Sequence, residues 1–110
     1  MTLTETQVLA RIERLSVTRL QSWIEMGCVR PAAGRDAAAY SEADLARLRL
    51  LCELVDDLAI DEAALPVVLS LLDQVHGLRR QLRLLAEAVE QQPAAVRNAV
   101  ARHMRGLAER

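Results

Sequence analysis

The chain has 110 residues, of which 52% are apolar, so it can build the compact core of one small domain. Its 14 basic residues are all arginine and are balanced by 15 acidic residues, giving a net charge of -1. This balance argues against a protein that mainly coats nucleic acid. The absence of lysine excludes lysine-based catalysis. Trp23 and Tyr40 are the only aromatic residues, which excludes a stacking platform for single-stranded nucleic acid.

The two cysteines, Cys28 and Cys52, are too far apart in sequence to form a CxxC motif. We expect both to be small buried hydrophobic residues in a reducing compartment. The chain shows no N-terminal targeting signal, and its longest uncharged run, residues 63–72, contains Pro66 and is too short to cross a membrane. The sequence therefore predicts a soluble cytoplasmic protein.

Two short helices separated by a tight turn open the chain. Thr4 and Gln7 have the spacing of a capping box at the start of the first helix. Ser16, or Thr18, is positioned to cap the second helix, which Gly27 would end in a left-handed conformation. The apolar faces are predicted to comprise Val8, Ile12 and Leu15 in the first helix and Leu20, Trp23 and Ile24 in the second.

A small wing and a third helix are predicted next. Residues 28–31 suit a short extended segment, and residues 32–39 suit a hairpin tip. Ser41 and Asp44 then form a second capping box, which opens the third helix. This helix carries Leu45, Leu48, Leu51, Cys52, Val55 and Leu58 on one side, and Leu50 and Leu54 on another.

A fourth helix is expected to open near Asp61, with its regular part starting closer to Ala64 because Pro66 is tolerated only in the first turn. Its apolar residues then follow alternating steps of four and three, which predicts a coiled-coil seam and a homodimer. The alternative is a long helix that lies on its own domain. The seam comprises Ala64, Val68, Leu71, Val75, Leu78, Leu82, Leu85 and Val89, and Val75 to Val89 would form the dimer interface.

Pro93 separates the long helix from a short amphipathic one over 94–108, whose apolar side carries Val96, Val100, Met104 and Leu107. The expected organisation is a helix-turn-helix domain over 1–60, a dimerising and partner-binding helix over 61–92, and a terminal helix over 93–110. The predicted fold class is all-α with a tiny β wing.

Acidic residues are concentrated in the middle of the chain. Residues 50–78 contain no arginine and six acidic residues, whereas seven arginines lie on each side of this block. Such a surface would steer a basic partner toward the junction of the third and fourth helices, although it could equally be a solubilising face. The candidate partner-binding residues are Glu53, Asp56, Asp57, Asp61, Glu62 and Asp73.

The order of helix, turn, helix, wing and third helix over residues 4–60 resembles the N-terminal domain of MerR-type regulators. The resemblance depends on six positions: Gly27, Pro31, Tyr40, Ser41, Asp44 and Leu45.

Residues 58–85 extend this resemblance to the chaperone-modulator family CbpM, through the Leu58–Asp61 turn, the aliphatic segment 67–73 and the Arg–Leu heptads after Leu78. Members of that family bind the J-domain of a DnaJ-type co-chaperone related to the curved-DNA-binding protein A. They inhibit its action on the Hsp70 partner and its DNA binding. The resemblance therefore implies a non-enzymatic modulator that competes for the J-domain.

A MerR-type DNA-binding regulator is the alternative. In those regulators the second helix carries an Arg-Tyr-Tyr-Glu-Arg run before its glycine, whereas this chain has Gln21 to Glu25 there, with both arginines missing. Losing phosphate contacts lowers DNA affinity steeply at physiological salt. Arg19, Arg30 and Arg35 remain as possible DNA contacts.

Enzymatic and metal-dependent functions have little support in the sequence. His76 and His103 are isolated, and no cysteine follows the long helix, where MerR-type metal sensors have theirs. The chain has no glycine-rich phosphate loop and no catalytic triad within plausible reach. We expect no cofactor, no metal and no catalytic residue.

Overall fold

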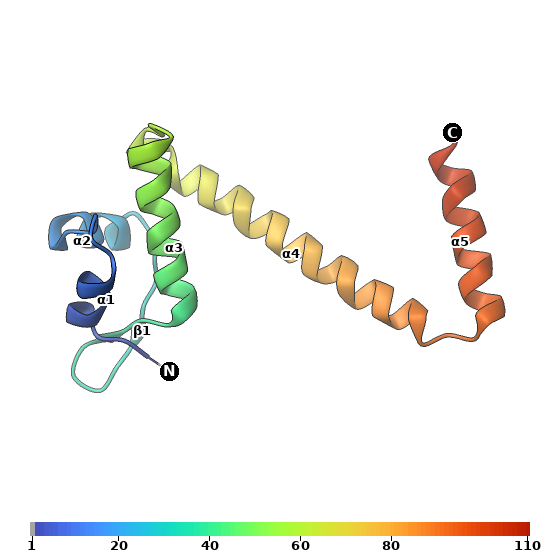
Figure 1. Cartoon of the computed structure of the whole chain (residues 1–110), viewed down its shortest axis with the longest axis horizontal. Coiled ribbons are helices and arrows are strands. Elements are labelled where there is room, and N and C mark those ends of the chain that lie inside the picture. The colour runs from blue at the N-terminus through green and yellow to red at the C-terminus, as the bar shows by residue number, and fades with distance from the viewer. Residues whose placement is uncertain (1) are drawn as a thin grey trace. The chain divides into compact units, whose positions relative to one another are not determined.

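The structure is a computed structural model that describes residues 2–110 (Figure 1). Its helices are α1 (Glu5–Arg11), α2 (Val17–Glu25), α3 (Glu42–Cys52), α4 (Leu65–Glu90) and α5 (Ala94–Ala108), and β1 (Ala32–Ala33) and β2 (Ala38–Ala39) are its strands. A π-helical turn, η1 (Glu53–Asp57), extends α3, and a 3₁₀ turn, η2 (Glu62–Ala64), precedes α4. The predicted class, mainly α with a small β wing and a long helix, is confirmed.

The chain divides into two compact units, Met1–Ser70 and Leu71–Arg110. The first unit contains α1 to α3, the hairpin and the first residues of α4. It reaches Ser70 because Leu65 and Leu69 of α4 are fully buried in it. The second unit contains the rest of α4 and α5.

The helices of the first unit begin where their capping residues predict. The Thr4 hydroxyl accepts the Gln7 backbone N–H at 3.2 Å, and the Gln7 side chain accepts the Thr4 N–H at 2.9 Å. Ser16, and not Thr18, caps α2 by accepting the backbone N–H of Arg19. The box at the start of α3 is also complete, as predicted. These caps satisfy N–H groups that have no partner inside the helix.

One apolar core joins α1, α2, α3 and the start of α4. Figure 1 shows α1 and α2 on one side of α3, whose N-terminal end lies near the hairpin. No polar or charged side chain within residues 2–110 is buried, so the hydrophobic effect dominates the stability of this unit. Its largest fully buried side chains are Trp23, Tyr40, Leu20, Leu45, Leu48, Leu51, Leu65 and Leu69.

The wing is shorter than expected, because the paired strands begin only at Ala32. Ala32 pairs with Ala39 and Ala33 with Ala38 in antiparallel register. Tyr40 then bridges to Leu3, which fixes the N-terminus against the base of the hairpin. Residues 28–31 are not part of a strand, although Cys28 and Val29 are buried.

Two expectations about helix faces were wrong. The first helix ends at Arg11, so Ile12 and Leu15 are buried from the segment after the helix. Leu58 was expected on a buried side of the third helix but is 65% exposed. Leu54, on the second apolar face of that helix, is buried, as a helix apolar on two faces requires. The physical reason for the exposure of Leu58 is the π turn, which places one extra residue in a turn and shifts the phase of the side chains that follow.

The break at 91–93 and the helix at 94–108 are confirmed: Pro93 directly precedes α5, as expected of a residue that cannot continue a helix. No helix within residues 2–110 combines the length and apolar character needed to span a membrane.

Ala59 provides a test of the connection between η1 and η2. Its φ is +53°, a left-handed conformation that costs an L-residue with a Cβ roughly 1–2 kcal/mol. We expect Ala59→Gly to raise the free energy of unfolding by about 0.5–1 kcal/mol, because the strain removed exceeds the added entropy of the unfolded chain.

Urea denaturation measures this change. Gly27→Ala is the opposite test, because Gly27 has a φ of +78°. This substitution should lower the free energy of unfolding by about 1 kcal/mol. Equal effects of the two substitutions would contradict the assigned backbone conformations.

Candidate interaction surface at the end of α3

Four charged side chains join the helix-turn-helix to the end of α3, and we call them the ion-pair cluster: Arg14, Arg19, Asp56 and Asp57. The Arg19 guanidinium donates two hydrogen bonds to the Asp56 carboxylate, at 2.7 and 3.0 Å. Arg14 donates to Asp57 at 2.9 Å and lies 3.8 Å from Asp56. Arg14 comes from the turn between α1 and α2, and Arg19 from the first turn of α2, so the cluster joins both to η1.

The cluster fixes the Arg19 side chain from several directions. Its guanidinium also donates to the backbone carbonyl of Arg14 at 3.2 Å and lies 5.2 Å from the centroid of the Trp23 ring, a cation–π distance. The hydrogen bond from Arg19 and its positive charge lower the pKa of Asp56, and the same hydrogen bond raises the pKa of Arg19. The pair is therefore charged at neutral pH.

The structure separates the six predicted partner-binding acids into two groups. Asp56 and Asp57 already bind arginines of the same unit. Glu53, Asp61 and Glu62 are exposed and form no ion pair within residues 2–110. The Asp61 carboxylate caps η2 by accepting the Ala63 N–H. Asp73 is also exposed but lies on α4 in the second unit.

Exposed apolar side chains lie within this acidic segment. Leu58 follows directly after the π turn and is 65% exposed, and Val67 in the first turn of α4 is 63% exposed. An exposed leucine that neighbours several exposed acidic residues in the sequence brings apolar area and negative charge to one segment. The sequence could not identify Leu58 because its exposure depends on the π turn.

The predicted dimer residues of α4 are exposed in the single chain. Leu78, Leu82 and Leu85 are each 60–64% exposed, Val75 is 41% exposed and Val89 is half-buried. The first turns of α4 bury a different face, through Leu65 and Leu69. The side chains from Val75 to Leu85 on the predicted interface are therefore exposed within the second unit, where a partner helix could cover them.

The three predicted DNA contacts are not equivalent in the structure. Arg19 is bound by Asp56, whereas Arg30 and Arg35 are exposed, Arg30 before β1 and Arg35 in the hairpin loop. On α2 itself, Gln21 and Glu25 are exposed. The sequence did not identify Arg14 as a functional residue, because its acidic partner is 43 positions away.

The two cysteines and the metal-ligating side chains are the remaining reactive groups to place. Burial raises the pKa of the Cys28 and Cys52 thiols, so both stay protonated at neutral pH. Within residues 2–110 no group of three or more histidine, cysteine or acidic side chains is arranged to hold a metal ion.

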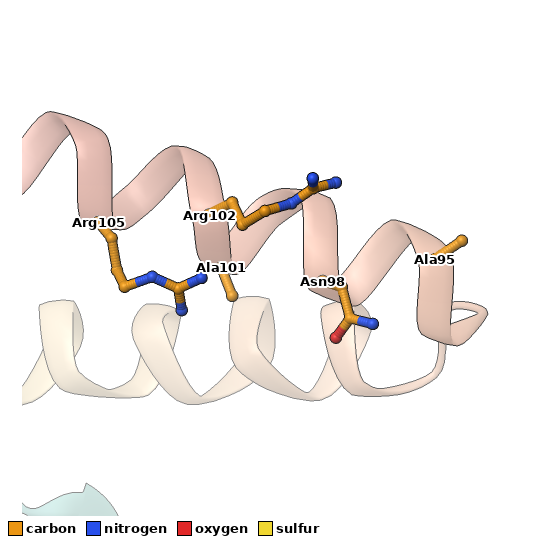
Figure 2. A pocket seen from close by; sticks show the side chains of 5 residues that line it. All are labelled: Ala95, Asn98, Ala101, Arg102 and Arg105. Atoms are coloured by element: carbon orange, nitrogen blue, oxygen red, sulfur yellow. The ribbon is translucent and has the colours of Figure 1, made fainter.

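Figure 2 shows a surface depression on α5 lined by Ala95, Asn98, Ala101, Arg102 and Arg105. All five residues belong to one helix, so the depression is open and does not enclose a ligand.

A family model described as MerR HTH family regulatory protein matches residues 3–87, and the chain belongs to this family. The matched segment covers α1 to α3, the wing and most of α4, and it leaves α5 outside. No curated protein and no solved structure shows significant similarity to the chain.

The ion pair between Arg19 and Asp56 predicts a specific pH dependence of stability. Because the folded protein lowers the pKa of Asp56, the pair stabilises the fold above the unfolded carboxyl pKa, about 3.9, and this stability is lost as the pH falls through the lower folded value. Asp56→Asn should therefore lower the melting temperature at pH 7, and the difference from the unsubstituted chain should shrink toward pH 2.

Thermal melts followed by circular dichroism between pH 7 and pH 2 measure this difference. Glu13→Gln is the control, because Glu13 forms no ion pair within residues 2–110. If the difference in melting temperature between Asp56→Asn and the unsubstituted chain does not change with pH, the Arg19–Asp56 ion pair does not stabilise the fold as proposed.

Proposed function

We propose that this member of the MerR helix-turn-helix regulatory family is a non-enzymatic chaperone modulator that binds the J-domain of a DnaJ-type co-chaperone. The binding surface is the end of α3, with its adjoining turns and the start of α4. Binding there would inhibit the co-chaperone by competing with its Hsp70 partner, without any covalent chemistry.

The observation that carries the proposal is an exposed leucine among exposed carboxylates. Leu58 is 65% exposed, and Glu53, Asp61 and Glu62 lie within five residues of it in the sequence. J-domains present a basic helix to Hsp70, and a negative surface with an apolar centre is complementary to such a helix. The resemblance of residues 58–85 to the CbpM family supports the same partner.

The carboxylates and the apolar side chain of this surface should contribute differently to the affinity for a partner. Exposed ion pairs contribute little affinity each, so the carboxylates chiefly set orientation and association rate. An apolar side chain that fills a partner pocket contributes more. Asp56 and Asp57 already bind arginines, so a partner would have to displace Arg19 or Arg14 to engage them. We therefore assign the anchor to Leu58 and the rim to Glu53, Asp61 and Glu62.

A DNA-binding regulator remains the second candidate, favoured by membership of a family of helix-turn-helix regulatory proteins. It predicts salt-sensitive binding of a dimer to a near-palindromic duplex through Arg30 and Arg35. A co-chaperone modulator predicts instead that a J-domain binds the chain in the absence of DNA.

Substitutions on the proposed surface test J-domain binding. Leu58→Ala should weaken binding of a purified J-domain about tenfold, because the apolar anchor is lost. Glu53→Lys/Glu62→Lys should weaken J-domain binding several-fold and reduce the salt dependence of that binding. Isothermal titration calorimetry measures both effects.

Leu84→Ala and Glu87→Lys/Glu109→Lys are matched controls, since they make the same chemical changes at exposed positions of the second unit. The assigned surface is wrong if the folded surface variants bind the J-domain as tightly as these controls do.

The seam of α4 makes a separate prediction. Leu78→Arg or Leu82→Arg should convert a dimer into a monomer, because an arginine would be buried in the interface without a partner. Leu84→Arg is the control, because Leu84 is 55% exposed but lies off the seam. Sedimentation equilibrium measures the mass, and a monomeric unsubstituted chain would refute the predicted dimer.

A further inference from the structure

The terminal helix α5 has an apolar side that the single chain leaves uncovered. Val96, Val100, Met104 and Leu107 recur at spacings of four, four and three residues, so they lie on one side of the helix. Val96, Met104 and Leu107 are 44–65% exposed, and no residue of α5 is buried by any other part of residues 2–110. A helix of 15 residues without packing contacts is only marginally stable in water, so α5 needs a surface to pack against.

The preceding helix, α4, leaves a similar apolar side uncovered. Leu78, Leu82 and Leu85 of the predicted seam are as exposed as the apolar residues of α5. Coiled coils usually sustain their apolar pattern over about three or four heptads or more, whereas residues 71–89 of the second unit make fewer than three. A further pair of apolar helix faces would therefore strengthen a dimer formed through this seam.

The connection between α4 and α5 is short and is held by hydrogen bonds. Residues 91–93 join the two helices, a loop length typical of antiparallel neighbours. The Arg97 guanidinium donates to the backbone carbonyls of Glu90 and Gln92 at 3.2 and 3.1 Å. These bonds satisfy carbonyls at the end of α4 and tie the first turn of α5 to it.

The apolar sides of the two helices converge near this loop, and the charges of α5 lie on its other side. Val89 and Val100 are the only half-buried residues within 73–110, and each belongs to the apolar side of its helix. At 100° per residue, the polar side of α5 faces away from its apolar side. That polar side lines the open depression of Figure 2 and comprises Asn98, Arg102 and Arg105.

We infer that α5 is the second half of an interface between two copies of this chain, in which the apolar sides of α4 and α5 from both copies enclose one core. Four helices that each bury one apolar side form a bundle, and the arginines on the polar side of α5 would stay in solvent. A lipid surface would cover α5 but would leave the seam of α4 exposed. The inference goes beyond the proposed function, since it concerns no J-domain, and it gives a role to the helix that lies outside the family match.

Substitutions on the apolar side of α5 test the inference in the full chain. Met104→Arg/Leu107→Arg should raise the dissociation constant of the dimer about tenfold or more, because two arginines would lie in an apolar interface without partners. Arginine is a good helix former, so α5 itself should persist. Sedimentation equilibrium over a concentration series measures the dissociation constant.

Ala95→Arg/Asn98→Arg is the matched control, because it adds the same charge on the polar side of α5. This control should change the dissociation constant by less than about twofold. If Met104→Arg/Leu107→Arg dimerises as tightly as the control, the inference is overturned, even where Leu82→Arg abolishes the dimer and upholds the seam. A monomeric unsubstituted chain would overturn it as well. Neither result bears on J-domain binding, so the proposed function is tested separately.

Hydrogen exchange of the unsubstituted chain is a second measurement, which needs no variant. An unpacked α5 should exchange its amides rapidly, and packing in the dimer should slow exchange over residues 96–108 about tenfold or more. The slowing should appear only above the dissociation constant of the dimer. Slow exchange of α5 in the monomer would place its apolar side against its own chain. Slowing that requires phosphatidylglycerol vesicles would place it on a lipid surface, and either result would overturn the inference.

Discussion

The bidentate pair between Arg19 and Asp56 is the interaction on which the surface chemistry of the first unit depends. It joins the first turn of α2 to the π turn that ends α3, at 2.7 and 3.0 Å. The apolar core places these elements together, but the pair decides which charges face solvent. It binds the arginine of α2 to Asp56 and leaves Glu53, Asp61 and Glu62 as exposed acidic residues of the first unit that form no ion pair within residues 2–110.

In the proposed function, this constraint would let a helix-turn-helix serve as a protein-binding module. The fold itself does not determine function, because recognition depends on the side chains that the scaffold presents. Here the second helix presents Gln21 and Glu25 with a bound arginine, while the end of α3 presents Leu58 beside carboxylates. In the proposed function, the same four charged residues would set the position of the partner surface.

Local signals in the sequence predicted much of the fold, whereas contacts between distant residues escaped prediction. Thr4, Ser16 and Ser41 identified the helix starts, because a cap depends on residues three positions apart. The π turn has no comparable signature, so the exposure of Leu58 was not predicted. The partners of Arg14 and Arg19 lie 43 and 37 positions away, a separation at which sequence periodicity carries no information.

Nuclear magnetic resonance titration of the ¹⁵N-labelled chain tests the central claim most directly, because one experiment reports every backbone amide. A purified J-domain and a duplex DNA are added in separate series in the same buffer. The account predicts that the J-domain perturbs amides over residues 53–62 at the end of α3 and that the duplex leaves α2 and the wing unperturbed. Duplex-induced shifts over residues 17–25 and 30–36, with no response to the J-domain, would contradict it.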